Sequence, residues 1–236
     1  MATKRKTKHT KYANLHELVT ECLTSVVFDA EGITAHEHLQ SPNTKLAVVF
    51  GDNASGKSLM LMVMSAFIGP RDESGEEKFS VSMRARTGTG MGRMFMYLDE
   101  DYSSTGAGSL HAASGAFHNA KERKHPVWLM LDEPDTGLSD KFASAMGAYF
   151  AREVNSLPEH IKGVVVVTHS RPLLRRLLAD LAQPPHEVSM GRSQTLAEYL
   201  DPSVVQEASV EELLALGDAA GKTMKNVMAI LHPKAK

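Results

Sequence analysis

The chain has 236 residues, a formal net charge of −2, and a composition of 42% hydrophobic and 23% charged residues. These values are typical of a globular protein and exclude a disordered or fibrous chain. No apolar run reaches the ~20 residues that a membrane-spanning helix needs, so we expect no membrane association. The single cysteine, Cys22, permits no intramolecular disulfide and favours a cytoplasmic location.

Residues 1–12 form a basic segment with five Lys or Arg residues and no acidic residue. We expect this tail to be disordered. Two interpretations stay open, namely a solvated tail that aids solubility and a contact with nucleic acid or another acidic surface. The main domain is predicted over 13–200, and an amphipathic, helical C-terminal appendage over 201–236.

The first elements of the main domain are predicted from turn signals and apolar runs. "SVVFDA" and "GITAHEHL", on either side of Glu31 and Gly32, are typical of a hairpin. "KLAVVF" (Lys45–Phe50) predicts a buried strand, and "LMLMVMSAFIG" (Leu59–Gly69) predicts a buried helix. Residues 70–92 are polar and contain several glycines, and 93–102 are predicted to form a strand.

The rest of the chain alternates between predicted helices and strands. Helices are predicted over 110–125, 139–157 and 171–183, and strands over 127–132, 163–170 and 186–191. Fully apolar strands that alternate with helices favour an α/β fold with a parallel-centred sheet. We therefore predict a sheet flanked by helices. The N-terminal hairpin would add a small antiparallel β-layer.

The segment "GDNASGKS" satisfies the phosphate-binding pattern G-x-x-x-x-G-K-[ST], with a strand before it and a helix after it. Its backbone N–H groups and the helix N-terminus attract a phosphate. Lys57 is expected to reach the β- and γ-phosphates, and Ser58 to hold Mg²⁺. The motif in this context predicts a P-loop NTPase fold. Its predicted ATP site comprises Gly51, Asp52, Asn53, Ala54, Ser55, Gly56, Lys57 and Ser58.

Two adjacent acids end the predicted strand "VWLMLD". Asp132 falls at the carboxyl end of that strand, where ligands bind in open α/β sheets, and is predicted to hold Mg²⁺. Glu133 follows and is predicted to activate a water molecule as general base. Pro134 stops the strand and fixes the turn.

"LMLDEPDTGLSD" resembles the Walker B and D-loop region of ABC-type P-loop ATPases. "GVVVVTHS" is similar to the next element of that family, a histidine after the following strand, here His169. The resemblance covers about 45–170. It implies that His169 hydrogen-bonds the γ-phosphate and the attacking water, and that the protein is a homodimer with ATP at its interface.

Two elements depart from the family pattern. Ser104-Thr105-Gly106 can stand for the S-x-G of the signature motif, which would place Ser104 and Gly106 on the partner protomer's nucleotide. An ordinary loop is the equal alternative. The family's Q-loop glutamine is missing, and acids of "YLDEDY" (Asp99, Glu100 or Asp101) are candidates to replace it.

The short span between the motifs resembles soluble AAA-family ATPases of DNA repair, chromosome maintenance and mobile-element defence rather than transporter subunits. This implies ATP hydrolysis that drives a conformational change in a separate effector protein. A nucleotide-dependent binding module with little hydrolysis is the alternative, and a small-molecule kinase is a third. His36 and His38 alternate on a predicted strand, but without a third ligand we expect them to be surface residues.

Overall fold

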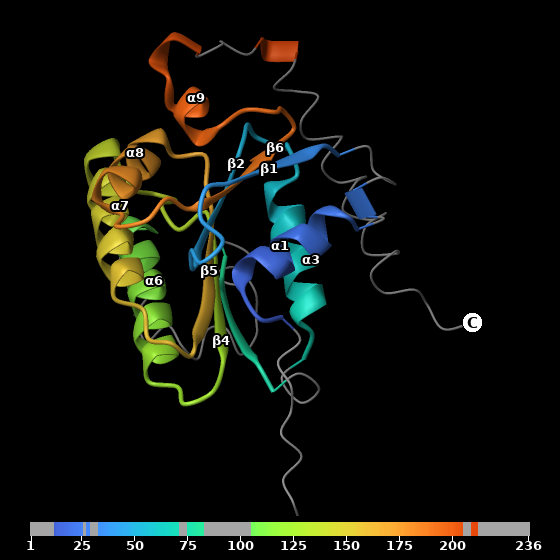
Figure 1. The fold of residues 1–236 in the computed structure, drawn as a ribbon. Helices are drawn as coiled ribbons and strands as arrows, with labels where there is room; N and C mark the ends of the chain where they lie inside the picture. The colour runs from blue at the N-terminus through green and yellow to red at the C-terminus, as the bar shows by residue number, and fades with distance from the viewer. Residues whose placement is uncertain are drawn as a thin grey trace, which may run out of the picture.

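The computed structural model describes residues 12–25, 27–28, 33–70, 75–82, 105–204 and 209–211. They form one six-stranded sheet with the strand order β1-β6-β2-β5-β4-β3 (Figure 1). The strands are β1 (Ala35–Leu39), β2 (Leu46–Phe50), β3 (Glu77–Val81), β4 (Val127–Asp132), β5 (Ile161–Val167) and β6 (His186–Met190). The helices are α1 (Leu15–Leu23), α3 (Lys57–Ile68), α6 (Thr105–Lys121), α7 (Asp140–Asn155), α8 (Arg171–Asp180), α9 (Leu196–Leu200) and a 3-10 turn, η2 (Pro202–Val204).

The sheet is parallel except at one edge. β2 pairs in parallel with β5 and β6, and β4 pairs in parallel with β5 and β3. β1 pairs antiparallel with β6. Every residue of β2 is buried, as expected for a strand covered on both faces. The predicted α/β class and the parallel centre of the sheet are confirmed.

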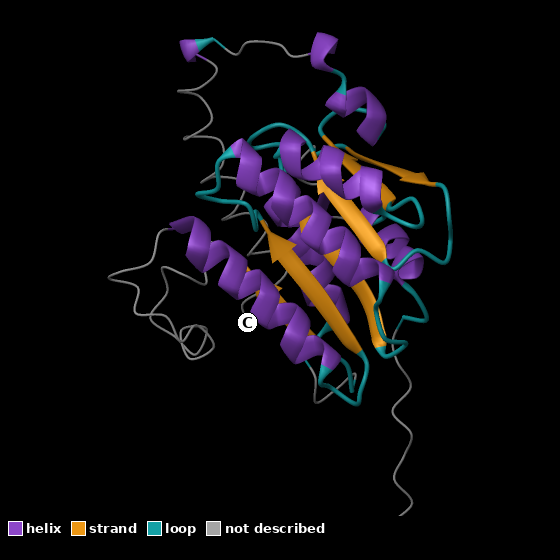
Figure 2. Cartoon of the chain, turned by 90° about the vertical axis from the view of Figure 1, so that its left-hand side faces the viewer, coloured by secondary structure: helices purple, strands orange, loops and turns teal. Residues whose placement is uncertain are grey.

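Helices cover both faces of the sheet. α6, α7 and α8 pack on one face, and α1 and α3 pack on the other (Figure 1). Figure 2 looks onto the side of the molecule that carries α6, α7 and α8. This division follows from the strand order, because right-handed crossovers toward β3 and toward β6 place their helices on opposite faces.

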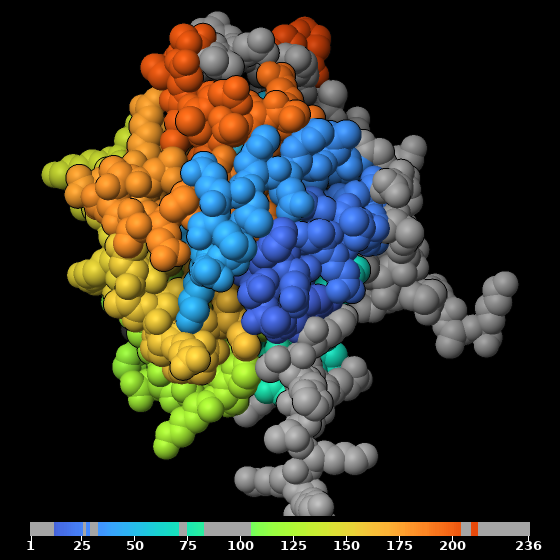
Figure 3. Space-filling model, in the orientation of Figure 1, coloured from blue at the N-terminus to red at the C-terminus, as the bar shows by residue number. Residues whose placement is uncertain are grey.

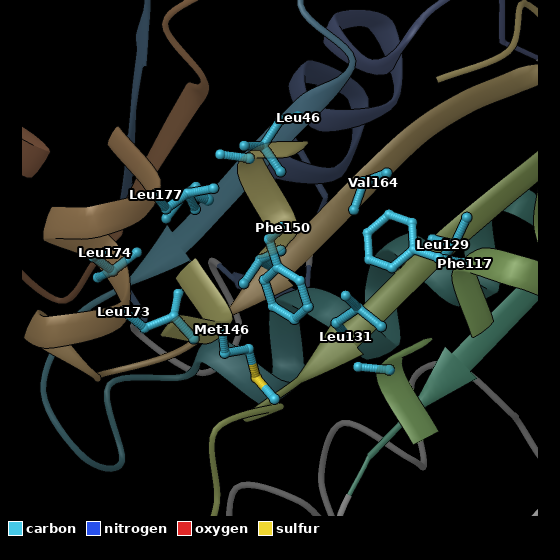
Figure 4. Packing of buried hydrophobic residues seen from close by; sticks show 14 of the residues in the cluster. Leu46, Phe117, Leu129, Leu131, Met146, Phe150, Val164, Leu173, Leu174 and Leu177 are labelled. Carbon is cyan, nitrogen blue, oxygen red and sulfur yellow. The ribbon is translucent and has the colours of Figure 1, made fainter. Parts of the chain in front are cut away.

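The larger of the two hydrophobic cores lies beneath α6, α7 and α8 (Figure 4). Phe150 stands near its centre and is fully buried. The residues labelled in Figure 4 are Leu46, Phe117, Leu129, Leu131, Met146, Phe150, Val164, Leu173, Leu174 and Leu177. α7 and α8 approach closely at Gly147, where an added Cβ would lie 3.0 Å from the backbone nitrogen of Leu177. A rigid core therefore supports the strands from below.

The predicted N-terminal hairpin is wrong. Val27 and Phe28 are helical, and β1 joins the edge of the main sheet beside β6 rather than forming a separate β-layer. The β-branched residues of this segment had suggested strand, but burial in the core beneath α1 and α3 overrides that propensity.

One strand was not predicted from the sequence, and three predicted segments lie wholly or mostly outside the described residues. β3 was not predicted, because its sequence "EKFSV" is only partly buried and carries charged residues. The strand predicted over 93–102, the basic tail over 1–11 and most of the C-terminal appendage lie outside the described residues. Within the described part of the chain, no helix combines the length and apolarity needed to cross a membrane.

Candidate nucleotide-binding site

Three neighbouring strands end at the same edge of the sheet. β5 lies between β2 and β4, and all three run in parallel. α3 leaves β2 on one face, whereas α8 leaves β5 on the other. Such a change of direction between adjacent strands opens a crevice at their carboxyl ends, where open α/β sheets bind ligands. Of the predicted site residues, Lys57 follows β2, His169 follows β5, and Asp132 is the last residue of β4.

The loop between β2 and α3 makes a tight turn with several positive φ angles. Gly51, Ala54 and Gly56 have φ angles of 145°, 58° and 98°. A Cβ at Gly51 would lie 2.5 Å from the carbonyl oxygen of Met190, so only glycine fits there. Gly56 caps α3 without a side chain, which leaves the first amides of the helix available to a ligand.

Lys57 bends back over this loop. Its Nζ donates hydrogen bonds to the carbonyl oxygens of Gly51, at 3.0 Å, and Asp52, at 2.7 Å. The side chain is only 6% exposed, and burial lowers the pKa of its ammonium group, although Glu133, Asp52 and Asp132 act in the opposite direction. A cation held in this way can exchange carbonyl oxygens for the oxygens of a phosphate.

Ser58 and Asp132 meet above the end of β5. Ser58 lies in the first turn of α3 and its Oγ donates to Asp132 Oδ1 at 3.3 Å. A hydroxyl and a carboxylate are oxygen ligands of the kind that Mg²⁺ takes, with water and phosphate oxygens completing its shell. The donor set therefore fits a magnesium ion bound together with a phosphate ligand.

Glu133 and His169 form the second contact across the crevice. His169 Nδ1 lies 3.2 Å from Glu133 Oε1, and the two side chains are 47% and 34% exposed. The hydrogen bond between them raises the pKa of His169 and lowers the pKa of Glu133. Glu133 has a left-handed backbone, with φ of 47°, and its N–H donates to the carbonyl oxygen of Val167. The contact with His169 thus keeps the partly exposed Glu133 carboxylate ionised.

Residues that sequence reasoning did not select support this pair. Thr168 Oγ1 donates to Asp135 Oδ1 at 2.7 Å and accepts from the N–H of Ser170 at 2.9 Å. Thr136 Oγ1 donates to the carbonyl oxygen of Glu133 at 2.9 Å. The sequence did contain a signal for these residues, because Thr136 and Thr168 are hydroxyl residues close to Glu133 and His169, and hydroxyls at strand ends often fix turns.

Ser55 adds a second sign of a ligand at the loop. Its Oγ is buried and has no hydrogen-bond partner among the described residues. This oxygen lies close to Gly51, where an added Cβ would be 2.9 Å away from it. Buried hydroxyls are normally satisfied, so an unpaired one beside free helix amides fits a site for phosphate oxygens.

The predicted signature loop is only partly described. Gly106 is buried in the first turn of α6 and packs on the segment after β4, where its Cβ would lie 2.7 Å from Leu138 Cδ2. Ser104 and the acids Asp99, Glu100 and Asp101 lie outside the described residues. Gly106 is therefore placed beside the segment Gly137–Leu138, while its predicted contact with a partner's nucleotide stays a prediction.

Comparison with models of known protein families gives no match, and comparison with curated protein sequences gives none either.

Proposed function

We propose that the protein binds ATP with Mg²⁺ and hydrolyses it as an ABC-type P-loop ATPase. The observation that carries the proposal is the meeting of two side-chain pairs at one sheet edge, Ser58 with Asp132 and Glu133 with His169. The buried Lys57 of the loop between β2 and α3 interacts electrostatically with Glu133 and Asp132, one member of each pair. This combination supplies groups for a phosphate chain, a metal ion and an attacking water.

The residues divide the work of the reaction. Lys57 exchanges its two carbonyl partners for phosphate oxygens, and the amides at the start of α3 bind the same phosphates. Ser58 and Asp132 would hold Mg²⁺, which would supply positive charge to the phosphate oxygens. Glu133 accepts a proton from a water whose oxygen attacks the γ-phosphorus. The bond to the β-phosphate oxygen then breaks, leaving ADP and inorganic phosphate.

His169 orients the base. Its hydrogen bond to Glu133 fixes the carboxylate, and its raised pKa keeps a proton available for a phosphate oxygen. A hydrogen-bond donor placed beside the developing negative charge stabilises the transition state more than the ground state. The predicted contact of His169 with the γ-phosphate is part of the proposal.

The homodimer is proposed from the surface beside this edge. A pocket of about 660 Å³ opens between α6 and α7, next to the segment after β4. Its walls include Leu110, Leu138, Phe142 and Tyr149, and Phe142 is 58% exposed. Large apolar groups at the surface of a soluble domain commonly mark an interface. A second copy that covers this pocket would bring its α6 N-terminus toward the nucleotide. Hydrolysis of the nucleotide would then drive a conformational change in a separate effector protein.

Glu133→Gln tests the proposal, because glutamine keeps the shape of the side chain and removes the base. Purified wild-type protein should release phosphate from ATP, and the variant should bind ATP with release reduced at least 100-fold. Glu122→Gln, an exposed change at the end of α6, is the matched control and should keep full activity. Equal turnover by Glu133→Gln would reject Glu133 as the base. ATP binding without release by the wild type would favour the nucleotide-dependent binding module.

The same variant tests dimerisation. Light scattering coupled to gel filtration should detect a dimer of Glu133→Gln when ATP and Mg²⁺ are present, and a monomer without them. Phe142→Ser should weaken that dimer. A monomer in every condition would reject the dimer while leaving hydrolysis to be judged by the phosphate assay.

A further inference from the structure

A cluster of two histidines and a glutamate lies on the α1 side of the sheet, apart from the nucleotide site. It joins His16 of α1, Glu37 of β1 and His186 of β6. Each residue offers one ligand atom, and these atoms all lie within 4.8 Å of one another. His186 is fully buried, and its Nε2 lies 3.0 Å from Glu37 Oε2. The rings of His16 and His186 are 5.5 Å apart between centroids.

The sheet register explains why these residues meet. In the antiparallel pair of β1 and β6, Glu37 lies opposite Val188 and Leu39 lies opposite His186. Side chains alternate between faces along a strand, so Glu37 and His186 are diagonal neighbours on one face. His36 and His38, which the sequence analysis considered as ligands and set aside for lack of a third, point to the other face.

The chemistry of the cluster matches a divalent transition metal. Two imidazoles and one carboxylate are the protein ligands of open zinc sites. Bonds of 2.0–2.2 Å in a tetrahedral arrangement require ligand atoms about 3.3–3.6 Å apart. The hydrogen-bond distance of 3.0 Å and the outer limit of 4.8 Å bracket that spacing, so small side-chain movements would close the site.

Thr20 supplies an outer hydrogen bond of the kind that metal ligands have. Its hydroxyl lies 3.3 Å from His16 Nδ1 and 3.4 Å from Glu37 Oε2. Outer partners of this kind fix the orientation of the ligand side chains. Figure 3 shows α1 and β1 side by side at the surface, and the side chain of Glu37 is 34% exposed. A metal ion can therefore enter from solvent, and water can fill the fourth position.

We propose that His16, Glu37 and His186 bind one divalent transition-metal ion, with Zn²⁺ the best match to the ligand set. The site is independent of the nucleotide site. His186 begins β6, whereas Met190, at the other end of that strand, adjoins Gly51. The bound ion ties the N-terminal helix α1 to the antiparallel edge of the sheet.

The test uses the full chain, stripped with a chelator and titrated with Zn²⁺ by calorimetry. Several surface histidines can bind zinc weakly, so the readout is the loss of the tightest site. His16→Ala and Glu37→Gln should each weaken that site at least tenfold, and each should abolish the Zn²⁺-dependent rise in Tm. His36→Ala, on the opposite face of the same strand, should bind like the wild type.

Further measurements separate the two metal sites. Asp132→Asn should leave the tight zinc site intact, because it alters only the magnesium ligands. Co²⁺ should give the visible absorption of a histidine-ligated ion in the wild type and in Asp132→Asn, but not in His16→Ala. Absence of tight Zn²⁺ binding by the wild type overturns the proposal, and so does wild-type affinity in both His16→Ala and Glu37→Gln.

Discussion

Thr168 Oγ1 donates a 2.7 Å hydrogen bond to Asp135 Oδ1, which joins the chain just after β5 to the chain just after β4. Thr168 is fully buried and directly precedes His169. Asp135 follows Glu133 by two residues. The two halves of the proposed catalytic pair are therefore connected twice, once through their own side chains and once through their neighbours.

Thr168→Val should separate these two connections. Valine keeps the shape of threonine but leaves Asp135 and the N–H of Ser170 without the hydroxyl, which should lower the free energy of unfolding by about 1–3 kcal/mol. We expect kcat for ATP hydrolysis to fall about tenfold, with a smaller change in KM, because positioning of the base is lost rather than phosphate binding. Thr168→Ser keeps the hydroxyl and should retain most activity. Unchanged kcat in Thr168→Val would show that this bond does not position Glu133.

The Glu133–His169 contact makes a prediction about pH. The raised pKa of His169 comes first from its hydrogen bond to Glu133, and the charges of Glu133 and Asp135 add to it, whereas burial and Lys57 act in the opposite direction. In Glu133→Gln the pKa of His169 should fall toward or below its ordinary value of 6.5. NMR titration of the His169 ring protons measures this shift directly. A pKa of His169 that is the same in both proteins would contradict the contact.

The same contact should give stability a defined pH window. Because the pKa of His169 is raised in the folded state, its protonation stabilises the fold below pH 6.5, and this stabilisation is lost as the pH rises through the pKa of the folded state. Because the pKa of Glu133 is lowered in the folded state, its ionisation stabilises the fold above pH 4.5, and this stabilisation is lost as the pH falls through the pKa of the folded state. The stability difference between wild type and Glu133→Gln should therefore be largest between these values and shrink on both sides, as chemical denaturation at several pH values can determine.

Lys57→Met should remove nucleotide binding without removing the fold. Methionine keeps the apolar stem in its buried position, but phosphate loses its cation. ATP with Mg²⁺ should raise the Tm of the wild type through ligand linkage and leave the Tm of the variant unchanged. Lys141→Met, an exposed change on α7, should respond like the wild type. An equal rise in Lys57→Met would place the nucleotide elsewhere.

Two glycines in the helical layer provide a matched pair for stability. A Cβ at Gly147 would collide with the backbone of α8 at Leu173 and Leu177, so Gly147→Ala should lower the free energy of unfolding by about 1–3 kcal/mol. A Cβ at Gly115, inside α6, meets nothing within 4 Å. Gly115→Ala should therefore raise the free energy of unfolding by about 0.5–1 kcal/mol. Chemical denaturation of both variants checks the close packing of α7 on α8.

The sequence predicted those parts of the fold that depend on local pattern. β2, β4 and β5 were found because strands buried on both faces read as continuous apolar runs. The strand and helix on either side of "GDNASGKS" were predicted because the motif requires both at fixed spacing, and the structure places Lys57 beside Glu133 and Asp132. Phosphate binding by this loop stays a prediction. These elements carry their information within a few consecutive residues.

What the sequence missed depends on distant partners. β3 is an edge strand of mixed polarity, and this sequence forms a strand only because it pairs with β4. β1 looked like half of a hairpin because the sequence does not record that β6, about 150 residues away, is its partner. For the same reason the cluster of His16, Glu37 and His186 was invisible, since its members come from three separate elements.

The left-handed backbone of Glu133 bears on how variants at this position are read. With φ of 47°, the residue adopts a conformation that glycine and asparagine tolerate and that β-branched side chains resist. Loss of activity in Glu133→Val would thus mix a missing carboxylate with a distorted turn. Glutamine isolates the missing charge, because it keeps the length of the side chain, and the difference between valine and glutamine reports the added cost of the turn. A saturation screen here would sort residues by backbone tolerance as well as by acidity.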